Sequence, residues 1–151
     1  MLLTSLQTLF QRDLQKLKQE IELYQQESNI WKVEPNITNS AGNLCLHLVG
    51  NLNQFIGKIL GGTDYVRNRE AEFADKDVPR SVLVGMVEET IQVVAASLQK
   101  VSPEQLQEPY PLEVFGYPMT TEFFLVHLAM HLDYHLGQVN YHRRLLDGMV
   151  E

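Results

Sequence analysis

Apolar residues recur at spacings of three and four along four long stretches of the chain, which places each set on one face of an α-helix. We expect helices over residues 4–26, 39–60, 79–100 and 120–146. The buried stripes are expected to be Leu3, Leu6, Phe10, Leu14, Leu17, Ile21 and Tyr24; Leu44, Leu48, Leu52, Phe55 and Ile59; Leu83, Met86, Thr90, Ile91, Val94, Leu98 and Val101; and Phe124, Leu128, Leu132, Val139 and Leu146.

Local residue types indicate where these helices begin and end. Asn39 or Ser40 can cap the second helix, and Gly61 is suited to end it in the left-handed conformation. Pro79 suits the first turn of the third helix. Residues 120–122 place capping hydroxyls ahead of a carboxylate, which is typical of the start of a helix.

Three connections separate the predicted helices. Residues 28–37 end the first helix and lead to the second, and Asp64–Val78 is a polar crossover with too few apolar residues for a strand. Ser102–Gln105 favours one short helical turn, and three prolines with a glycine keep Glu108–Met119 irregular. Because no stretch predicts a strand, the fold class is all-α, a four-helix bundle with long crossover connections in a single domain over residues 1–151.

Composition and charge exclude several classes of function. The net charge is −7 and the longest basic run is Arg143-Arg144, so the chain lacks the clustered basic face of a nucleic-acid-binding protein. Cys45 is the only cysteine, which precludes an intrachain disulfide and is typical of a reducing cytoplasm. Residues 1–3 lack a basic leader region, and no run approaches the roughly 20 apolar residues of a membrane span. We therefore expect a soluble, cytoplasmic protein.

Four of the five histidines lie in the last predicted helix. Nitrogens that bind one ion at about 2.1 Å lie within roughly 4 Å of one another. Histidines four residues apart on a helix can meet this condition. Histidines eight residues apart cannot, because they are separated by about 12 Å along the helix axis. Counting roughly 100° per residue from Leu128, His135 lies about 20° and His131 about 60° from the centre of the buried stripe, whereas His127 lies about 100° away. The inward pair is therefore His131 and His135.

His47, in the second helix, is the histidine that can complete a site with this pair. His142 also faces inward, but it lies two turns from His135, and Cys45 projects roughly 160° away from His47. Three neutral imidazoles suit zinc, nickel, iron or copper and leave one to three positions for water or substrate. The alternative is that each histidine is a core residue with satisfied hydrogen bonds, and for His127 and His142 we retain that interpretation.

Other catalytic motifs are missing from the sequence. The segment from His131 to His135 has no glutamate in the position that metalloproteases use as a general base, and Asp133 points away from the histidine face. No nucleophile elbow, phosphate-binding loop or dinucleotide fingerprint occurs. The sequence therefore places no general base beside the predicted metal.

Two segments resemble the DinB-like superfamily, which includes damage-inducible and YfiT-like metalloenzymes. They are HLDYHLGQ at residues 131–138 and HLVGNL at residues 47–52, and the resemblance in helix order and length extends over essentially the whole chain. The resemblance implies an up-down-down-up four-helix bundle, frequently a homodimer, that binds nickel or zinc through His47, His131 and His135. It also implies that Gln138 is a packing group or a partner of a ligand. Leu136 stands where many relatives carry an arginine, which removes the anionic contact that the arginine would make.

The resemblance bears on function as well. Some relatives are thiol-dependent transferases or isomerases that use mycothiol or bacillithiol. We therefore expect a divalent-metal-dependent enzyme of hydrolase or low-molecular-weight-thiol transferase type, acting on a small molecule. The alternatives are a non-catalytic dimeric metal-binding or stress-response protein in which the metal braces the fold, and a bundle without metal.

Overall fold

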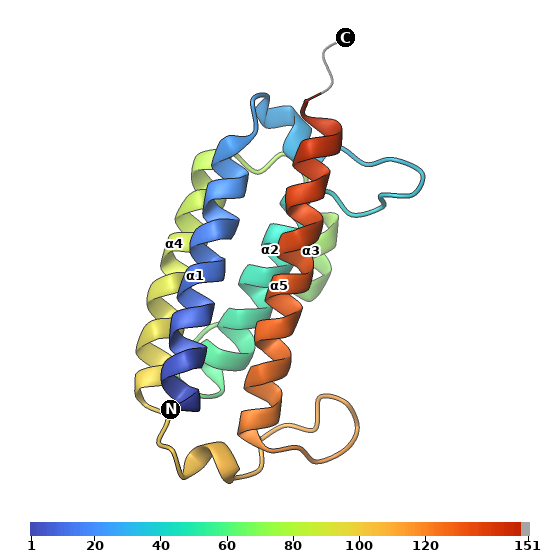
Figure 1. The fold of residues 1–151 in the computed structure, drawn as a ribbon. Coiled ribbons are helices and arrows are strands. Elements are labelled where there is room, and N and C mark those ends of the chain that lie inside the picture. Colours follow the sequence, from blue (N-terminus) through green and yellow to red (C-terminus); the bar gives the residue numbers. More distant parts are fainter. Residues whose placement is uncertain (149–151) are drawn as a thin grey trace.

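The computed structural model describes residues 1–148, which form five α-helices and no β-strand (Figure 1). The elements are α1 (Leu2–Leu23), α2 (Ala41–Leu52), α3 (Arg69–Ala74), α4 (Arg80–Gln99) and α5 (Thr121–Leu146), with short 3-10 helices at Glu27–Trp31 and Gln105–Gln107 and a π-helical segment at Asn53–Lys58. The prediction of an all-α fold is confirmed.

Four long helices enclose the core. α1 packs against α4 and α5, and α2 packs against α4, α5 and the short α3. In Figure 1, α1 and α5 run in one direction along the molecule, and α2 and α4 run in the opposite direction. All four predicted stripes contribute to the largest side chains with almost no exposed surface, and Ile30 and Ile56 join them from outside the stripes. The full set is Phe10, Leu14, Leu17, Ile21, Tyr24, Ile30, Leu48, Leu52, Ile56, Leu83, Leu98 and Phe124. Burial of these apolar surfaces is the main favourable contribution to folding.

The first helix ends earlier than its sequence predicts. α1 stops at Leu23 rather than Gln26. The Asp147 carboxylate accepts hydrogen bonds from the backbone N–H groups of Gln25 and Gln26, at 2.7 and 3.2 Å. These bonds hold an extended turn, after which a short 3-10 helix begins at Glu27. The helix is shorter because its stop signal comes from a residue more than one hundred positions away.

The second helix changes its geometry halfway along. The prediction of a regular helix with Phe55 and Ile59 in the buried stripe is wrong in part, because residues Asn53–Lys58 are π-helical. A π-turn holds more residues than an α-turn and rotates the side chains that follow. As a result Ile56 is fully buried, while Phe55 and Ile59 are only partly buried.

The end of this helix also differs from expectation. Gly62, with φ of 74°, adopts the left-handed conformation that the sequence analysis assigned to Gly61. Gly61 has another role, since a Cβ at that position would overlap the hydroxyl of Ser97 on α4. The two glycines therefore serve a turn and a close helix contact, respectively.

A short helix lies inside the connection over residues 64–78, which the sequence predicts only as a polar crossover. α3 begins after Asn68, whose side chain accepts a hydrogen bond from the backbone N–H of Ala71 at 3.1 Å. It packs against α2 and buries the carboxylate of Glu72. Six residues are too few to show a helical hydrophobic pattern, so the sequence did not reveal α3.

The predicted helix starts are largely confirmed. The hydroxyl of Ser40 accepts a hydrogen bond from the N–H of Asn43, and that of Thr120 accepts one from the N–H of Phe123, both at 3.1 Å. Each bond satisfies one of the N–H groups that the first turn leaves free. Pro79 immediately precedes α4 rather than occupying its first turn.

Among residues 1–148, α4 alone is long and apolar enough to cross a membrane by length and composition. Core helices of soluble proteins meet the same criterion. α4 contacts α1 and α2, and 39% of its apolar window is buried. The helix therefore supplies part of the core, and its composition is weak support for a membrane span.

Candidate metal centre

Three histidines from α2 and α5 converge where the sequence predicted a site. One ligand atom from each of His47, His131 and His135 lies within 4.8 Å of the other two. The Nε2 atoms of His47 and His131 are 3.2 Å apart, and the His135 ring centroid lies 4.6 Å from that of His131 and 5.4 Å from that of His47. Two nitrogens bound to one tetrahedral ion at about 2.1 Å lie about 3.4 Å apart. The cluster could therefore hold a metal ion.

The cluster lies at the edge of the core rather than at its centre. His47 is buried, whereas His131 and His135 are partly exposed. The three side chains thus leave a route from solvent to the point where they meet. The prediction that they meet is confirmed, and their role as metal ligands stays a prediction.

A buried ion pair orients His47. The carboxylate of Glu72 accepts a hydrogen bond from Nδ1 of His47 at 3.0 Å and two bonds from Arg67, at 2.9 and 3.0 Å. The Glu72 and Arg67 side chains are only 6% and 14% exposed. Because a carboxylate accepts the Nδ1 proton, the lone pair of His47 is on Nε2 and faces the other histidines. A carboxylate behind a metal-binding histidine commonly fixes its tautomer in this way.

Glu72 reaches His47 because Gly50 leaves room for it. Gly50 follows His47 by three residues on the same face of α2. A Cβ placed on Gly50 would stand 1.9 Å from Oε2 of Glu72, closer than any real contact. The glycine in the HLVGNL segment is therefore a requirement of the buried carboxylate.

Gln138 orients the second histidine. Its Oε1 lies 2.7 Å from Nδ1 of His135 and accepts that proton, so His135 also carries its lone pair on Nε2. His131 has no such partner, because its Nδ1 is buried without a hydrogen bond in the described part of the chain. The interpretation of these residues as ordinary core histidines with satisfied hydrogen bonds does not fit His131.

Burial favours the uncharged form of two histidines in the cluster, His131 and His47, by lowering the pKa of each. Burial, together with the neighbouring His135 and His47, lowers the pKa of His131 to about 4. Burial also lowers the pKa of His47, more than contact with Glu72 raises it. Both imidazoles are therefore uncharged at neutral pH, and the uncharged form is the one that binds a divalent cation.

Comparison with known proteins identifies the family. Residues 2–149 match the model of a family described as "Protein of unknown function (DUF1572)". The chain belongs to the DUF1572 family. DUF1572 is a DinB-like family, in agreement with the resemblance of the two histidine segments. No curated protein matches the chain.

His142 of this DUF1572 member packs in the core, as predicted. Its Nδ1 accepts a hydrogen bond from the Tyr24 hydroxyl at 2.6 Å, and its Nε2 donates to the carbonyl of Lys32 at 2.8 Å. The ring is 3% exposed. His142 thus joins α5 to the end of α1 and to the connection that follows.

We expect His142 to make stability depend on pH. Burial lowers its pKa, in opposition to the bond with the Lys32 carbonyl, which raises it. The ordinary pKa of histidine is 6.5. Below that pH, His142 is protonated in the unfolded chain but stays neutral in the folded chain. The contribution of His142 to the free energy of unfolding is therefore complete above pH 6.5 and declines below it. The melting temperature in EDTA should fall between pH 7 and 5, by less in His142→Gln. An equal fall in both proteins would contradict this role.

His127 and Cys45 remain outside the cluster of this DUF1572 protein. The His127 ring packs against Phe115 and Phe124, with ring centroids 4.8 and 5.9 Å away. The centroid of the His131 ring is 6.3 Å from it. Cys45 is fully buried, and burial raises the pKa of its thiol to about 12. Neither residue is therefore placed as a ligand or nucleophile, in agreement with the sequence analysis.

Sequence reasoning did not connect Glu72 or Arg67 with the DUF1572 site. Both lie in the connection that its charged composition predicts to be a polar crossover, and the spacing gives Arg67 no more than a possible place beside a pocket. The pairing of Glu72 with His47 spans 25 residues and depends on how α3 folds against α2, and Arg67 reaches the site only through Glu72. Two local features could have indicated these residues. Asn68 is a suitable cap for a short helix that contains Glu72, and Gly50, three residues after His47, leaves room for a side chain from another segment.

Proposed function

We propose that this protein is a divalent-metal-dependent enzyme in which His47, His131 and His135 hold nickel or zinc. The convergence of three ring nitrogens, two of them aimed by Glu72 and Gln138, carries the proposal. A divalent ion held here would act as a Lewis acid. It would lower the pKa of a bound water or thiol, or polarise a carbonyl group. Three protein ligands leave a position for substrate, which is typical of a catalytic site.

We infer that the reaction is thiol transfer rather than hydrolysis. The cluster's own carboxylate, Glu72, is occupied by His47 and Arg67 and is not free to take a proton from water. A metal would ionise a bound thiol more completely than a bound water, and the proton passes to solvent, so thiol transfer depends less on a protein base than hydrolysis does. A low-molecular-weight thiol is therefore the proposed co-substrate, and hydrolysis is the second candidate.

We also propose that α1, α2, α4 and α5 form an up-down-down-up four-helix bundle in a single cytoplasmic domain that assembles as a homodimer. The mutual packing and chain directions of these helices support the bundle (Figure 1). The single, reduced Cys45 supports a reducing compartment. Exposed apolar side chains on α5, among them Phe123 and Met130, are available for contact with a second copy.

Metal analysis of protein purified without an affinity tag tests the site. We expect about one nickel or zinc ion per chain, and almost none in His131→Ala, because two imidazoles hold an ion far more weakly than three. His127→Ala is the matched control, since it removes a histidine from the same helix that is not one of the three proposed ligands, and it should retain the metal. Equal metal content in the wild type and in His131→Ala would refute the site.

Activity distinguishes a catalytic metal from one that braces the fold. Conjugation of a low-molecular-weight thiol to a chromogenic aryl halide should be lost on chelation and return with added zinc or nickel. A metal-loaded protein that is inactive and whose melting temperature falls steeply on chelation would favour the bracing role. A loaded protein that hydrolyses ester substrates but transfers no thiol would favour the hydrolase.

A further inference from the structure

Two polar atoms in the interior of the bundle, Nδ1 of His131 and Oδ1 of Asn51, are buried without a hydrogen-bond partner among residues 1–148. Asn51 as a whole is only 7% exposed. A buried polar group that lacks a partner costs free energy, and most such groups in proteins are paired. The role of Asn51 therefore needs an explanation, as does the lone Nδ1 of His131.

Asn51 and His131 lie in neighbouring positions across two helices. Asn51 follows His47 by one turn on the same face of α2, and α2 and α5 run in opposite directions (Figure 1). The rings of His47 and His131 are 5.1 Å apart, and two turns further along α2 the ring of Phe55 is 5.2 Å from that of Phe124. These two contacts bracket Asn51 and place its side chain opposite the turns of α5 between Phe124 and His131.

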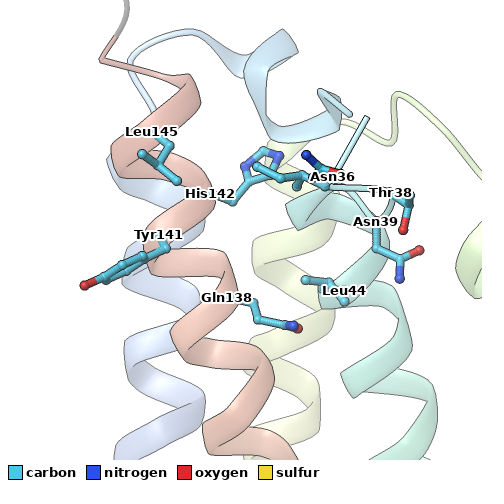
Figure 2. Close-up of a pocket in the computed structure, with 9 residues that line it drawn as sticks. Asn36, Thr38, Asn39, Leu44, Gln138, Tyr141, His142 and Leu145 are labelled. Carbon is cyan, nitrogen blue, oxygen red and sulfur yellow. The ribbon is translucent and has the colours of Figure 1, made fainter. Parts of the chain in front are cut away.

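The other two histidines of the cluster each have an acceptor for the Nδ1 proton. Glu72 serves the histidine on α2, and Gln138, which points from α5 towards α2 (Figure 2), serves His135. His131 lacks such a partner in the described part of the chain. Oδ1 of Asn51 is an acceptor of the same kind as the carboxamide oxygen of Gln138.

The position of one proton explains why both atoms are unpaired. The Nε2 atoms of His47 and His131 are 3.2 Å apart, and the proton of His47 is on Nδ1, where Glu72 accepts it. A hydrogen bond between the two rings therefore requires the proton of His131 to be on Nε2. Nδ1 of His131 is then an acceptor, as is Oδ1 of Asn51, and two acceptors do not bond to each other.

We propose that Asn51 is the positioning residue for His131, and that Oδ1 of Asn51 accepts the Nδ1 proton of His131 when Nε2 of that ring binds a metal ion. Nε2 then gives its proton to solvent and Nδ1 takes one from solvent, so His131 releases no net proton. The new bond would fix the tautomer of the third ligand, as Glu72 and Gln138 fix those of the first two. This inference rests on the proposed metal site and adds a residue that acts through one of its ligands.

Long-range proton–nitrogen NMR correlation spectra test the inference, because they report which ring nitrogen of each histidine carries a proton. Comparison with His131→Ala identifies the signals of His131. In the wild type its proton should be on Nε2 without zinc and on Nδ1 after zinc is added. In Asn51→Asp the carboxylate can only accept, so Nδ1 should be protonated even before zinc is added. A merely structural role of Asn51 would not move this proton.

Zinc affinity, measured by competition with a chromophoric chelator, is the second readout. Asn51→Leu nearly preserves the volume of the side chain but removes the acceptor, so it should bind zinc about 10- to 100-fold more weakly than the wild type. Asn51→Asp should bind zinc at least as tightly as the wild type. Gln92→Leu, which removes a carboxamide from the exposed side of α4, is the control and should match the wild type in both assays.

The inference is overturned if Asn51→Leu binds zinc as tightly as the wild type, or if Nδ1 of His131 stays unprotonated in metal-free Asn51→Asp. A proton on Nδ1 in the metal-free wild type would refute the change of tautomer. A wild type that binds no zinc would instead reject the proposed metal-dependent function. In that case the metal-free spectra of the wild type and Asn51→Asp would still decide whether Asn51 contacts His131.

Discussion

Glu72→Leu is expected to lower the free energy of unfolding by about 3–5 kcal/mol and the affinity for zinc by about 10- to 100-fold. The variant leaves the guanidinium of Arg67 without its partner at a position where only 14% of the side chain is exposed. It also removes the acceptor that holds Nδ1 of His47. Urea denaturation of the metal-free protein measures the first effect, and competition with a chromophoric chelator measures the second.

The double variant Arg67→Leu/Glu72→Leu separates the two effects. Apolar replacement of a whole buried ion pair is often neutral or stabilising, so most of the lost stability should return. The zinc affinity should stay low, because His47 still lacks its acceptor. Glu88→Leu is the control: the Glu88 side chain is 55% exposed and its partner Lys18 is 26% exposed, so the cost should stay below about 1 kcal/mol. If the double variant recovered full zinc affinity, Glu72 would have no role in orienting His47.

Gly50→Ala is expected to expel the same carboxylate without altering any polar group. The added methyl group would overlap Oε2 of Glu72, so either the acid or α2 must move. Overpacking of this kind costs about 1–3 kcal/mol, and displacement of Glu72 should reduce zinc affinity as Glu72→Leu does. Both quantities are measured in the same two assays.

Gly85→Ala is a matched control, because no atom lies within 4 Å of a Cβ built at Gly85 on α4. Alanine is the better helix former by up to about 1 kcal/mol, so this variant should be slightly stabilised and bind zinc normally. Indistinguishable zinc affinities for Gly50→Ala and Gly85→Ala would show that the space beside α2 is not needed for the site.

The parts of this fold that follow from the sequence depend on short-range rules. Helical periodicity gave the four long helices, and hydroxyl caps gave the starts of α2 and α5 at Ser40 and Thr120. Helical phase alone selected His131 and His135 as the inward pair. These inferences succeeded because each property is determined within two turns of one helix.

The parts that did not follow depend on contacts between distant segments. Asp147 terminates α1 from the far end of the chain, and Ser97 of α4 occupies the space at Gly61. The π-helical segment after Leu52 changes which residues face the core, and a count of 100° per residue assumes a regular α-helix and so misplaces them. Glu72 belongs to the same class, because a carboxylate in a charged connection becomes a buried acceptor only when α3 lies against α2.

The position of Glu72 in the connection between α2 and α4 limits how far the length of that connection can change. In most helical proteins the connections accept insertions freely, because they contribute little to the core. Here the connection between α2 and α4 delivers the acceptor for a histidine on α2 and the arginine that holds it. A change in the length of residues 64–78 would therefore alter the histidine cluster as directly as a substitution in it. The geometry of the three histidines thus depends on a connection that contributes none of them: Glu72 comes from α3 and Arg67 from the residues just before it.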